Sequence, residues 1–313
     1  MTALNTTGIH HPKLDPTVRT MLQAGPAMPD LRTLTPAEFR AMPLLLQPAP
    51  EVVARIVQRS IPSPGGWIRL RIYWPEGPGP HPALVYLHGG GWVVGSIDGS
   101  DRFCRDLTNA AGAVIISVDY RLSPETKFPG ALDDTMAVLS WTRDAAAELQ
   151  VDAARIGVGG MSAGGNLAAA AALVARDRGA LAIGFQLLIV PVLDRRCDSL
   201  SMREYADGPS LTADAMRWFW EQYLERPEDG ASPYASVAEA SDLRALPPAL
   251  VVTAGCDPLC SEGEAYAERL REAGVDATVR RYDGMPHGFL GFAGLDAAKR
   301  AMTEIGESIR AHL

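Results

Sequence analysis

Gly160-Met161-Ser162-Ala163-Gly164 is the most informative turn in this chain, because it joins a strand-like run to a helix-like one. The run before it, Arg155–Gly159, is largely apolar, and the run after it, Asn166–Ala175, is rich in alanine. In such a context, G-x-S-x-G forms a sharp turn that pushes the serine hydroxyl out of the sheet edge. The flanking glycines let strand and helix approach closely. The stretch therefore predicts an α/β protein with Ser162 as a candidate nucleophile.

Short, almost continuously apolar runs recur on both sides of this turn, mostly separated by helical patterns of ten or more residues. The runs are Ala83–Leu87, Ala113–Val118, Ile156–Gly159, Ile183–Val192 and Ala249–Thr253, with Ala277–Tyr282 as a more polar sixth. Strands that crossover helices bury on both faces have this appearance. Upstream, Ala54–Pro62 and Trp67–Trp74 alternate around Ser63-Pro-Gly-Gly66 and predict a β-hairpin. Together these elements predict a mostly parallel, eight-stranded sheet.

Two segments lack this alternation of strand-like and helix-like runs. Residues 1–50 carry eight prolines and two short amphipathic stretches, Pro16–Gln23 and Pro36–Leu46, which favour short helices lying over a domain. Residues 195–245 contain no buried-strand run but include an aromatic helix with Thr212 as a plausible N-cap. An aromatic stripe is usually core, although its position in an insertion favours a cap over the active site. We therefore expect a catalytic domain of residues 51–194 and 246–313, capped by 1–50 and 195–245.

A serine nucleophile needs a base that a third group orients. His287 is the best candidate base, because it lies in a turn after the last strand-like run. Asp257 follows the preceding buried run, at the end of the strand where ligand-facing residues of open α/β sheets lie. Asp257 could instead cap a turn before Pro258, and Glu262 is the rival acid, although a helix start should carry it away from His287.

His88-Gly-Gly-Gly91 supplies the remaining part of an acyl-transfer site. Preorganised backbone N–H groups stabilise the negative charge that develops on a carbonyl oxygen, and glycines let the main chain come close. We assign the oxyanion donors to the N–H groups of Gly90, Gly91 and Ala163. His88 is expected to support the glycine loop rather than act as a base. A phosphate loop is disfavoured, because the run lacks a Gly-Lys-Ser/Thr ending.

Composition narrows the classes of partner. The net charge of −8, from 29 Lys and Arg against 37 Asp and Glu, argues against nucleic acid or an anionic membrane surface. Four cysteines are too few and too scattered for a disulfide framework, and no second Cys/His pair completes a zinc site with Cys256 and Cys260. We find no signal-peptide pattern and no apolar run of the roughly 18 residues that a membrane span needs. We therefore expect a cytoplasmic protein with free thiols and no stable membrane association.

Five motifs in order resemble the bacterial esterases of the hormone-sensitive lipase family. They are His88-Gly-Gly-Gly-Trp92, Asp119-Tyr-Arg-Leu-Ser-Pro-Glu125, Gly160-Met-Ser-Ala-Gly-Gly165, Asp257-Pro-Leu259 and His287-Gly-Phe289. The resemblance implies an α/β-hydrolase fold with a helical cap and a serine carboxylesterase that needs no metal or organic cofactor. Asp119 and Glu125 would organise the site through hydrogen bonds and ion pairs. Met161 departs from the family's usual Asp or Thr, which leaves the subfamily and the substrate range open.

These observations lead us to expect hydrolysis of short- to medium-chain carboxylic esters through an acyl-enzyme. The candidate residues for an apolar substrate pocket are Trp92, Leu211, Met216 and Phe219. A non-catalytic small-molecule binding protein on the same scaffold is the alternative from another class, resembling the plant gibberellin receptors of this family. An amidase, lactonase or carbamate hydrolase with the same triad is a further alternative, because one triad serves every acyl transfer. The resemblance also implies a possible homodimer.

Overall fold

The computed structural model describes residues 7–25, 29, 31–42, 51–179, 181–292 and 294–313. Its centre is one eight-stranded sheet in the order β1-β2-β4-β3-β5-β6-β7-β8. The strands are β1 Arg55–Ser63, β2 Gly66–Trp74, β3 His81–Leu87, β4 Val114–Asp119, β5 Val151–Met161, β6 Gln186–Ile189, β7 Ala249–Cys256 and β8 Ala277–Pro286. β2 pairs antiparallel with β1 and β4, and all other pairs are parallel. The predicted mostly parallel sheet and its leading hairpin are confirmed.

β6 is shorter than the apolar run that predicted it. The run covers residues 183–192, but the strand ends at Ile189. Two features of the chain account for this end. Val190 has a φ of +39°, and Pro191 has no N–H to donate to a ladder.

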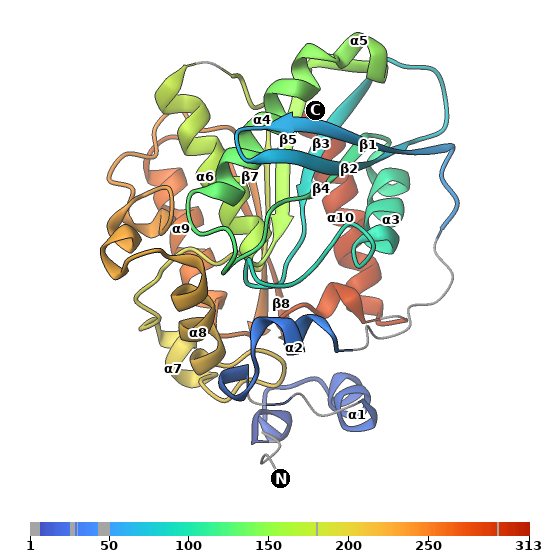
Figure 1. Ribbon diagram of the computed structural model, residues 1–313. Helices are drawn as coiled ribbons and strands as arrows, with labels where there is room; N and C mark the ends of the chain where they lie inside the picture. The colour runs from blue at the N-terminus through green and yellow to red at the C-terminus, as the bar shows by residue number, and fades with distance from the viewer. Residues whose placement is uncertain (1–6, 26–28, 30, 43–50, 180, 293) are drawn as a thin grey trace.

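Helices cover both faces of the sheet and also form a separate group at one end of it. The helices are α1 Pro16–Ala24, α2 Pro36–Arg40, α3 Asp101–Ala111, α4 Gly130–Asp144, α5 Ala146–Leu149, α6 Ala163–Arg178, α7 Leu200–Glu204, α8 Ala213–Tyr223, α9 Cys260–Glu272 and α10 Asp296–His312. Figure 1 shows α4 and α6 on one side of the sheet and α3 and α10 on the other. No helix in the described ranges is long and apolar enough to cross a membrane.

The alternation of side chains along each strand divides the core into two parts. In β3, Ala83, Val85 and Leu87 face a core that α4, α6 and α9 complete. Leu84 and Tyr86 face the opposite core, which α3 and α10 complete. Successive side chains of a strand point to opposite faces, so a run that is apolar throughout must be covered on both sides. The continuous apolar runs of the sequence therefore account for the layered architecture.

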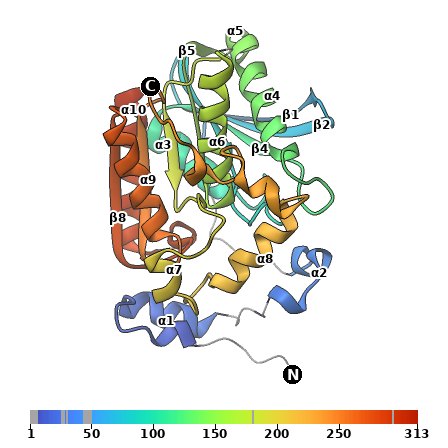
Figure 2. The ribbon, with the colours of Figure 1, turned by 90° about the vertical axis from the view of Figure 1, so that its left-hand side faces the viewer.

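The N-terminal segment and the 195–245 segment lie together at one end of the molecule, where Figure 2 shows α1 and α2 near α7 and α8. Local capping explains where the helices begin. The Asp15 carboxylate accepts hydrogen bonds from the first turn of α1, and Thr35 forms a capping box with Glu38 in α2. The Thr212 hydroxyl caps α8, as predicted. The stretch predicted as helical over residues 36–46 is helical only to Arg40, and residues 43–50 lie outside the described ranges.

Candidate active site

Ser162 occupies a strained turn between β5 and α6. Its φ of +57° and ψ of −116° are unusual for a residue with a side chain. The Ser162 N–H donates to the Ile189 carbonyl at 2.8 Å, and the Ser162 carbonyl accepts from the Val192 N–H at 3.2 Å. A Cβ atom on Gly160 would overlap the carbonyl of Gly164. Close backbone approach therefore requires glycine at this position, as the motif indicated.

The imidazole of His287 lies between Ser162 and Asp257. Its Nε2 atom is 3.0 Å from Oγ of Ser162, and its Nδ1 atom is 2.7 Å from Oδ2 of Asp257. His287 directly follows β8, and its carbonyl accepts a hydrogen bond from the Ser210 hydroxyl at 2.9 Å. A carboxylate can only accept, so Nδ1 carries the proton and Nε2 is free to accept the proton of Ser162. The three side chains have the geometry of a nucleophile, a base and an orienting acid.

Asp257 faces His287 and also accepts a turn hydrogen bond, which are the two roles that its sequence position left open. It directly follows β7, and its side chain is 1% exposed. Its Oδ1 atom accepts the Leu259 N–H at 2.9 Å, as a turn-forming aspartate does, while Oδ2 faces His287. The backbone contact immobilises the carboxylate that holds the imidazole.

Glu262, the rival acid, has a different set of partners. Its Oε1 atom accepts the N–H groups of Leu193 and Asp194, at 2.7 and 3.4 Å. Burial raises the pKa of the Glu262 carboxyl well above its ordinary value. Because α9 begins at Cys260, Glu262 lies in its first turn and holds the chain that leaves β6. It is a structural residue in this arrangement.

The glycine loop after β3 lies directly against the serine. A Cβ atom on Gly89 would lie 3.6 Å from the Cβ of Ser162. Gly90 and Gly91 have φ values of +118° and +59°, which favour glycine. Ala163 is the first residue of α6, so its N–H has no acceptor within the helix. Gly90 lines the same cavity as Ser162, and Ala163 directly follows Ser162 in the chain, whereas Gly91 packs on Phe219. The assignment of the three N–H groups as oxyanion donors stays a prediction.

His88 is buried beneath this loop. Its ring stacks on Tyr120 at 4.2 Å between centroids, and its Nδ1 atom is 2.8 Å from the Gly89 carbonyl. Burial lowers the pKa of His88 and favours the neutral ring. A carbonyl oxygen only accepts, so Nδ1 carries the proton. The Tyr120 hydroxyl in turn donates to the His88 carbonyl at 2.9 Å. These contacts suit a loop support, which is the role expected from the sequence.

Asp119 and Glu125 lie in different surroundings. Asp119, at the end of β4, pairs with Arg69 of β2 at 2.6 Å. Glu125 binds the guanidinium of Arg40 through both oxygens, at 2.8 and 2.7 Å, and this contact lowers the pKa of Glu125. Sequence reasoning missed Arg40, because a basic residue at the end of a short helix carries no local signal of a partner 85 residues away.

Ser162 and His287 open into a cavity of about 1120 Å³. Beyond them it extends between one face of α3 and one face of α10. The lining residues from these helices are Arg102, Phe103, Asp106 and Asn109 of α3, and Ala298, Lys299 and Met302 of α10. Phe103, Asp106 and Asn109 follow one another at three residues, as do Lys299 and Met302, which is the spacing of one helical face. Tyr86, Leu290 and Phe292 add apolar surface to the cavity wall.

A sequence profile of the α/β-hydrolase fold matches residues 84–291, two thirds of the chain. The carboxylic ester hydrolase LipN of Mycobacterium tuberculosis is 38% identical over 96% of this chain and 83% of its own length. The chain belongs to the hormone-sensitive lipase family of α/β hydrolases.

Solved structures agree with this assignment of the hydrolase. An esterase of Pyrobaculum calidifontis superposes with a TM-score of 0.87 and 41% identity, over 95% of this chain and 98% of that one. An arylesterase of Saccharolobus solfataricus is 42% identical over 71% of this chain and 72% of its own length. Fold and sequence therefore give the same family.

The four side chains predicted to line a substrate pocket lie elsewhere in this α/β hydrolase. Trp92 is fully buried and stacks on Tyr223 of α8 at 4.1 Å, with 5° between the rings. Phe219 packs against Gly91, where its ring occupies the space of a Cβ atom. Leu211 and Met216 belong to the same buried core. None of the four is among the described lining residues of the cavity. The aromatic side chains of α8 belong to the core and pack on the glycine loop. The prediction that they line a substrate pocket, which rested on their position in an insertion, is therefore wrong.

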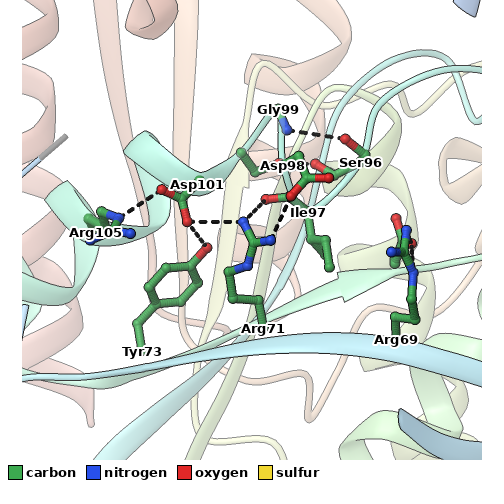
Figure 3. A network of polar contacts seen from close by, with 11 residues as sticks. Arg69, Arg71, Tyr73, Ser96, Ile97, Asp98, Gly99, Asp101 and Arg105 are labelled. Carbon is green, nitrogen blue, oxygen red and sulfur yellow. Dashed lines mark hydrogen bonds and ion pairs between the residues drawn. The ribbon is translucent and has the colours of Figure 1, made fainter. Parts of the chain in front are cut away.

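A polar network holds one wall of the hydrolase cavity, the segment 96–101 that leads into α3. Figure 3 shows Arg71 of β2 between two carboxylates of this segment. Its guanidinium lies 2.6 Å from Asp98 and 3.1 Å from Asp101. Tyr73 and Arg105 also bind Asp101, at 2.9 and 2.7 Å. The wall is thereby tied both to the sheet and to α3.

Proposed function

We propose that this hydrolase is a serine carboxylesterase with Ser162 as nucleophile, His287 as base and Asp257 as the acid that orients the imidazole. The observation that carries the proposal is the imidazole of His287 in hydrogen-bonding distance of both other side chains. The names of the relatives support the same reaction class, because they are esterases and carboxylic ester hydrolases.

The reaction follows from these positions. Ser162 Oγ attacks the ester carbonyl carbon while His287 Nε2 takes its proton. Negative charge moves to the carbonyl oxygen, which accepts hydrogen bonds from Gly90, Gly91 and Ala163. His287 then protonates the leaving alcohol, and the acyl group remains on Ser162. A water molecule, deprotonated by His287, hydrolyses the acyl-enzyme by the same steps in reverse.

The groove between α3 and α10 suits the longer arm of the ester. The α10 wall from Leu295 to Met302 spans about 10 Å at roughly 1.5 Å per residue. This is the length of about eight extended methylene groups. Phe103 and Ala298 lie along it and present apolar surface. These dimensions support esters of short to medium chain.

The cap of this enzyme would consist of residues 1–50 and 195–245, over a catalytic domain of residues 51–194 and 246–313. The grouping of α1, α2, α7 and α8 at one end supports this division. A homodimer and a cytoplasmic location stay predictions. Light scattering coupled to gel filtration tests the first, and fractionation of the source cells tests the second.

Hydrolysis of p-nitrophenyl esters from acetate to decanoate tests the function. Wild type and Ser162→Ala are compared at equal concentration, with circular dichroism to show that both are folded. We expect ester hydrolysis that collapses in the variant. Hydrolysis of p-nitroanilides but not esters would favour an amidase. Tight ligand binding without turnover would favour a binding protein.

A further inference from the structure

Arg40 reaches from α2 to the segment that follows the glycine loop. Its Nε atom donates to the Val93 carbonyl at 2.7 Å. Its Nη2 atom donates to the Ser123 carbonyl at 2.7 Å, and the outer nitrogens bind both oxygens of Glu125. One guanidinium from the N-terminal segment therefore binds two backbone carbonyls and one carboxylate of the catalytic domain.

The backbone held by Arg40 is strained. Gly90 and Gly91 are followed by Trp92 at a φ of +61°, which is an outlier for a bulky residue. Such conformations persist only where the surroundings over-determine them, and they cluster at functional sites. The strained stretch contains two of the three proposed oxyanion donors, so whatever holds it also sets the direction of their N–H groups.

Three contacts hold this stretch, and Arg40, which makes one of them, also lines the cavity of Ser162. The Trp92 ring stacks on Tyr223, and the Trp92 carbonyl accepts the Ser123 N–H at 2.8 Å. The next carbonyl, that of Val93, is bound by Arg40. Because Arg40 also binds the Ser123 carbonyl, its guanidinium joins the two chain segments that meet at Trp92.

α2 makes a second, apolar connection to the same loop. Phe39, next to Arg40, lies 6.2 Å from Phe219 between ring centroids. Phe219 in turn packs on Gly91. The position of α2 is thus linked to the glycine loop through one polar and one apolar contact.

The ion pair between Arg40 and Glu125 does not by itself explain why Arg40 makes these contacts. The Arg40 side chain is 29% exposed and that of Glu125 is 62% exposed, and exposed pairs contribute little to stability. The geometry is more informative, because only a planar fork of donors can serve two carbonyls and a carboxylate at once. Lysine would keep the charge but not the fork.

We propose that Arg40 is a positioning residue that couples the docking of α2 to the conformation of the oxyanion loop. The inference rests on the proposed esterase function for its kinetic consequence, but the coupling itself does not depend on it. The N-terminal segment is then part of the apparatus that stabilises the transition state, in addition to covering the site.

Kinetics of Arg40→Ala and Arg40→Lys with p-nitrophenyl butyrate test the proposal. Active sites are titrated with a p-nitrophenyl phosphonate, so that an inactive fraction is not mistaken for a slow enzyme. We expect kcat per active site to fall at least about tenfold in Arg40→Ala, short of the roughly 10²–10³-fold loss on removing a direct donor. KM should change far less. Butaneboronic acid forms a charged tetrahedral adduct on a serine, so its affinity should fall in parallel with kcat/KM across the variants.

Arg217→Ala is the matched control, because it removes an exposed guanidinium that pairs with Asp214 on α8. It should leave kcat and boronate affinity unchanged. Arg40→Lys should resemble Arg40→Ala more than wild type. An Arg40→Ala enzyme with wild-type kcat per active site and wild-type boronate affinity would overturn the proposal. An equal loss in Arg217→Ala would also overturn it.

Amide hydrogen exchange over residues 88–95 provides a readout that needs no substrate. We expect faster exchange in Arg40→Ala than in wild type and in Arg217→Ala. Unchanged exchange would overturn the coupling even if the enzyme hydrolyses esters. Faster exchange in a protein that hydrolyses no ester would support the coupling and count against the proposed function alone.

Discussion

The Nε2 atom of His287 lies 3.0 Å from Oγ of Ser162, although 125 residues separate them in the chain. The turn after β5 raises the serine, and the turn after β8 carries the imidazole to the same edge of the sheet. Parallel strands have their carboxyl ends at one edge, which is where open α/β sheets bind their ligands. The contact is therefore a consequence of the parallel topology.

If this pair acts as a unit, its mutations should not be additive. We expect Ser162→Ala and His287→Ala each to lower kcat by several orders of magnitude, on the order of the 10⁶-fold seen for such pairs. The double variant should be no worse than either single variant. Kinetics with p-nitrophenyl butyrate check this, and multiplied losses in the double variant would argue that the two side chains act independently.

Asp257 and Glu262, the candidate acid and its rival, should respond differently to neutral isosteres. Asp257→Asn keeps the shape but favours the wrong tautomer of His287, so we expect kcat to fall about 10⁴-fold. Glu262→Gln keeps an oxygen for the Leu193 N–H and should alter kcat only a few-fold. Steady-state kinetics of both variants check this prediction. A larger loss in Glu262→Gln than in Asp257→Asn would reverse the assignment of the acid.

Glu262 should also make stability depend on pH. Burial raises the pKa of its carboxyl well above 4.5, so the folded protein binds this proton more tightly than the unfolded chain does. Its contribution to stability is fully present below the unfolded pKa and is lost as the pH rises through the folded pKa. We expect wild type to lose free energy of unfolding relative to Glu262→Gln as the pH rises above about 4.5. Urea unfolding of both proteins from pH 5 to 8 measures the difference, and a constant difference would contradict the prediction.

Chain-length selectivity should respond to the α3–α10 groove and not to α8. Ala298→Phe adds a ring to the cavity wall, so we expect decanoate hydrolysis to fall far more than acetate hydrolysis. Phe219→Ala, which removes a contact with Gly91, should lower kcat for every ester alike. The ratios of kcat/KM along the p-nitrophenyl series check both. A changed chain-length profile in Phe219→Ala, together with an unchanged profile in Ala298→Phe, would show that α8 and not the α3–α10 groove lines the substrate pocket.

The strands and helix starts of this protein could be predicted, because local sequence patterns determine them. The apolar runs predicted the strands, and Thr212 predicted the start of α8, because strand burial and helix capping are read over a few residues. Two boundaries differ from the predicted ones, and Val190 and Pro191 explain the first of them. β6 stops short of its apolar run before Pro191, and α2 ends at Arg40 within a longer amphipathic stretch.

The sequence by itself determined the sheet, the strained serine turn and the candidate residues Ser162, Asp257 and His287, because motif spacing and strand order constrain these positions. The sequence also predicted His88 as a support of the glycine loop, but only the tertiary structure decided which surfaces line the cavity and that Arg40 binds the segment after the loop. Phe219, predicted to line the pocket, packs on Gly91 instead, and Arg40 binds the Val93 carbonyl, 53 residues away in the chain. Both contacts depend on how separate elements pack. Packing partners that are distant in the chain leave no period or motif in the sequence.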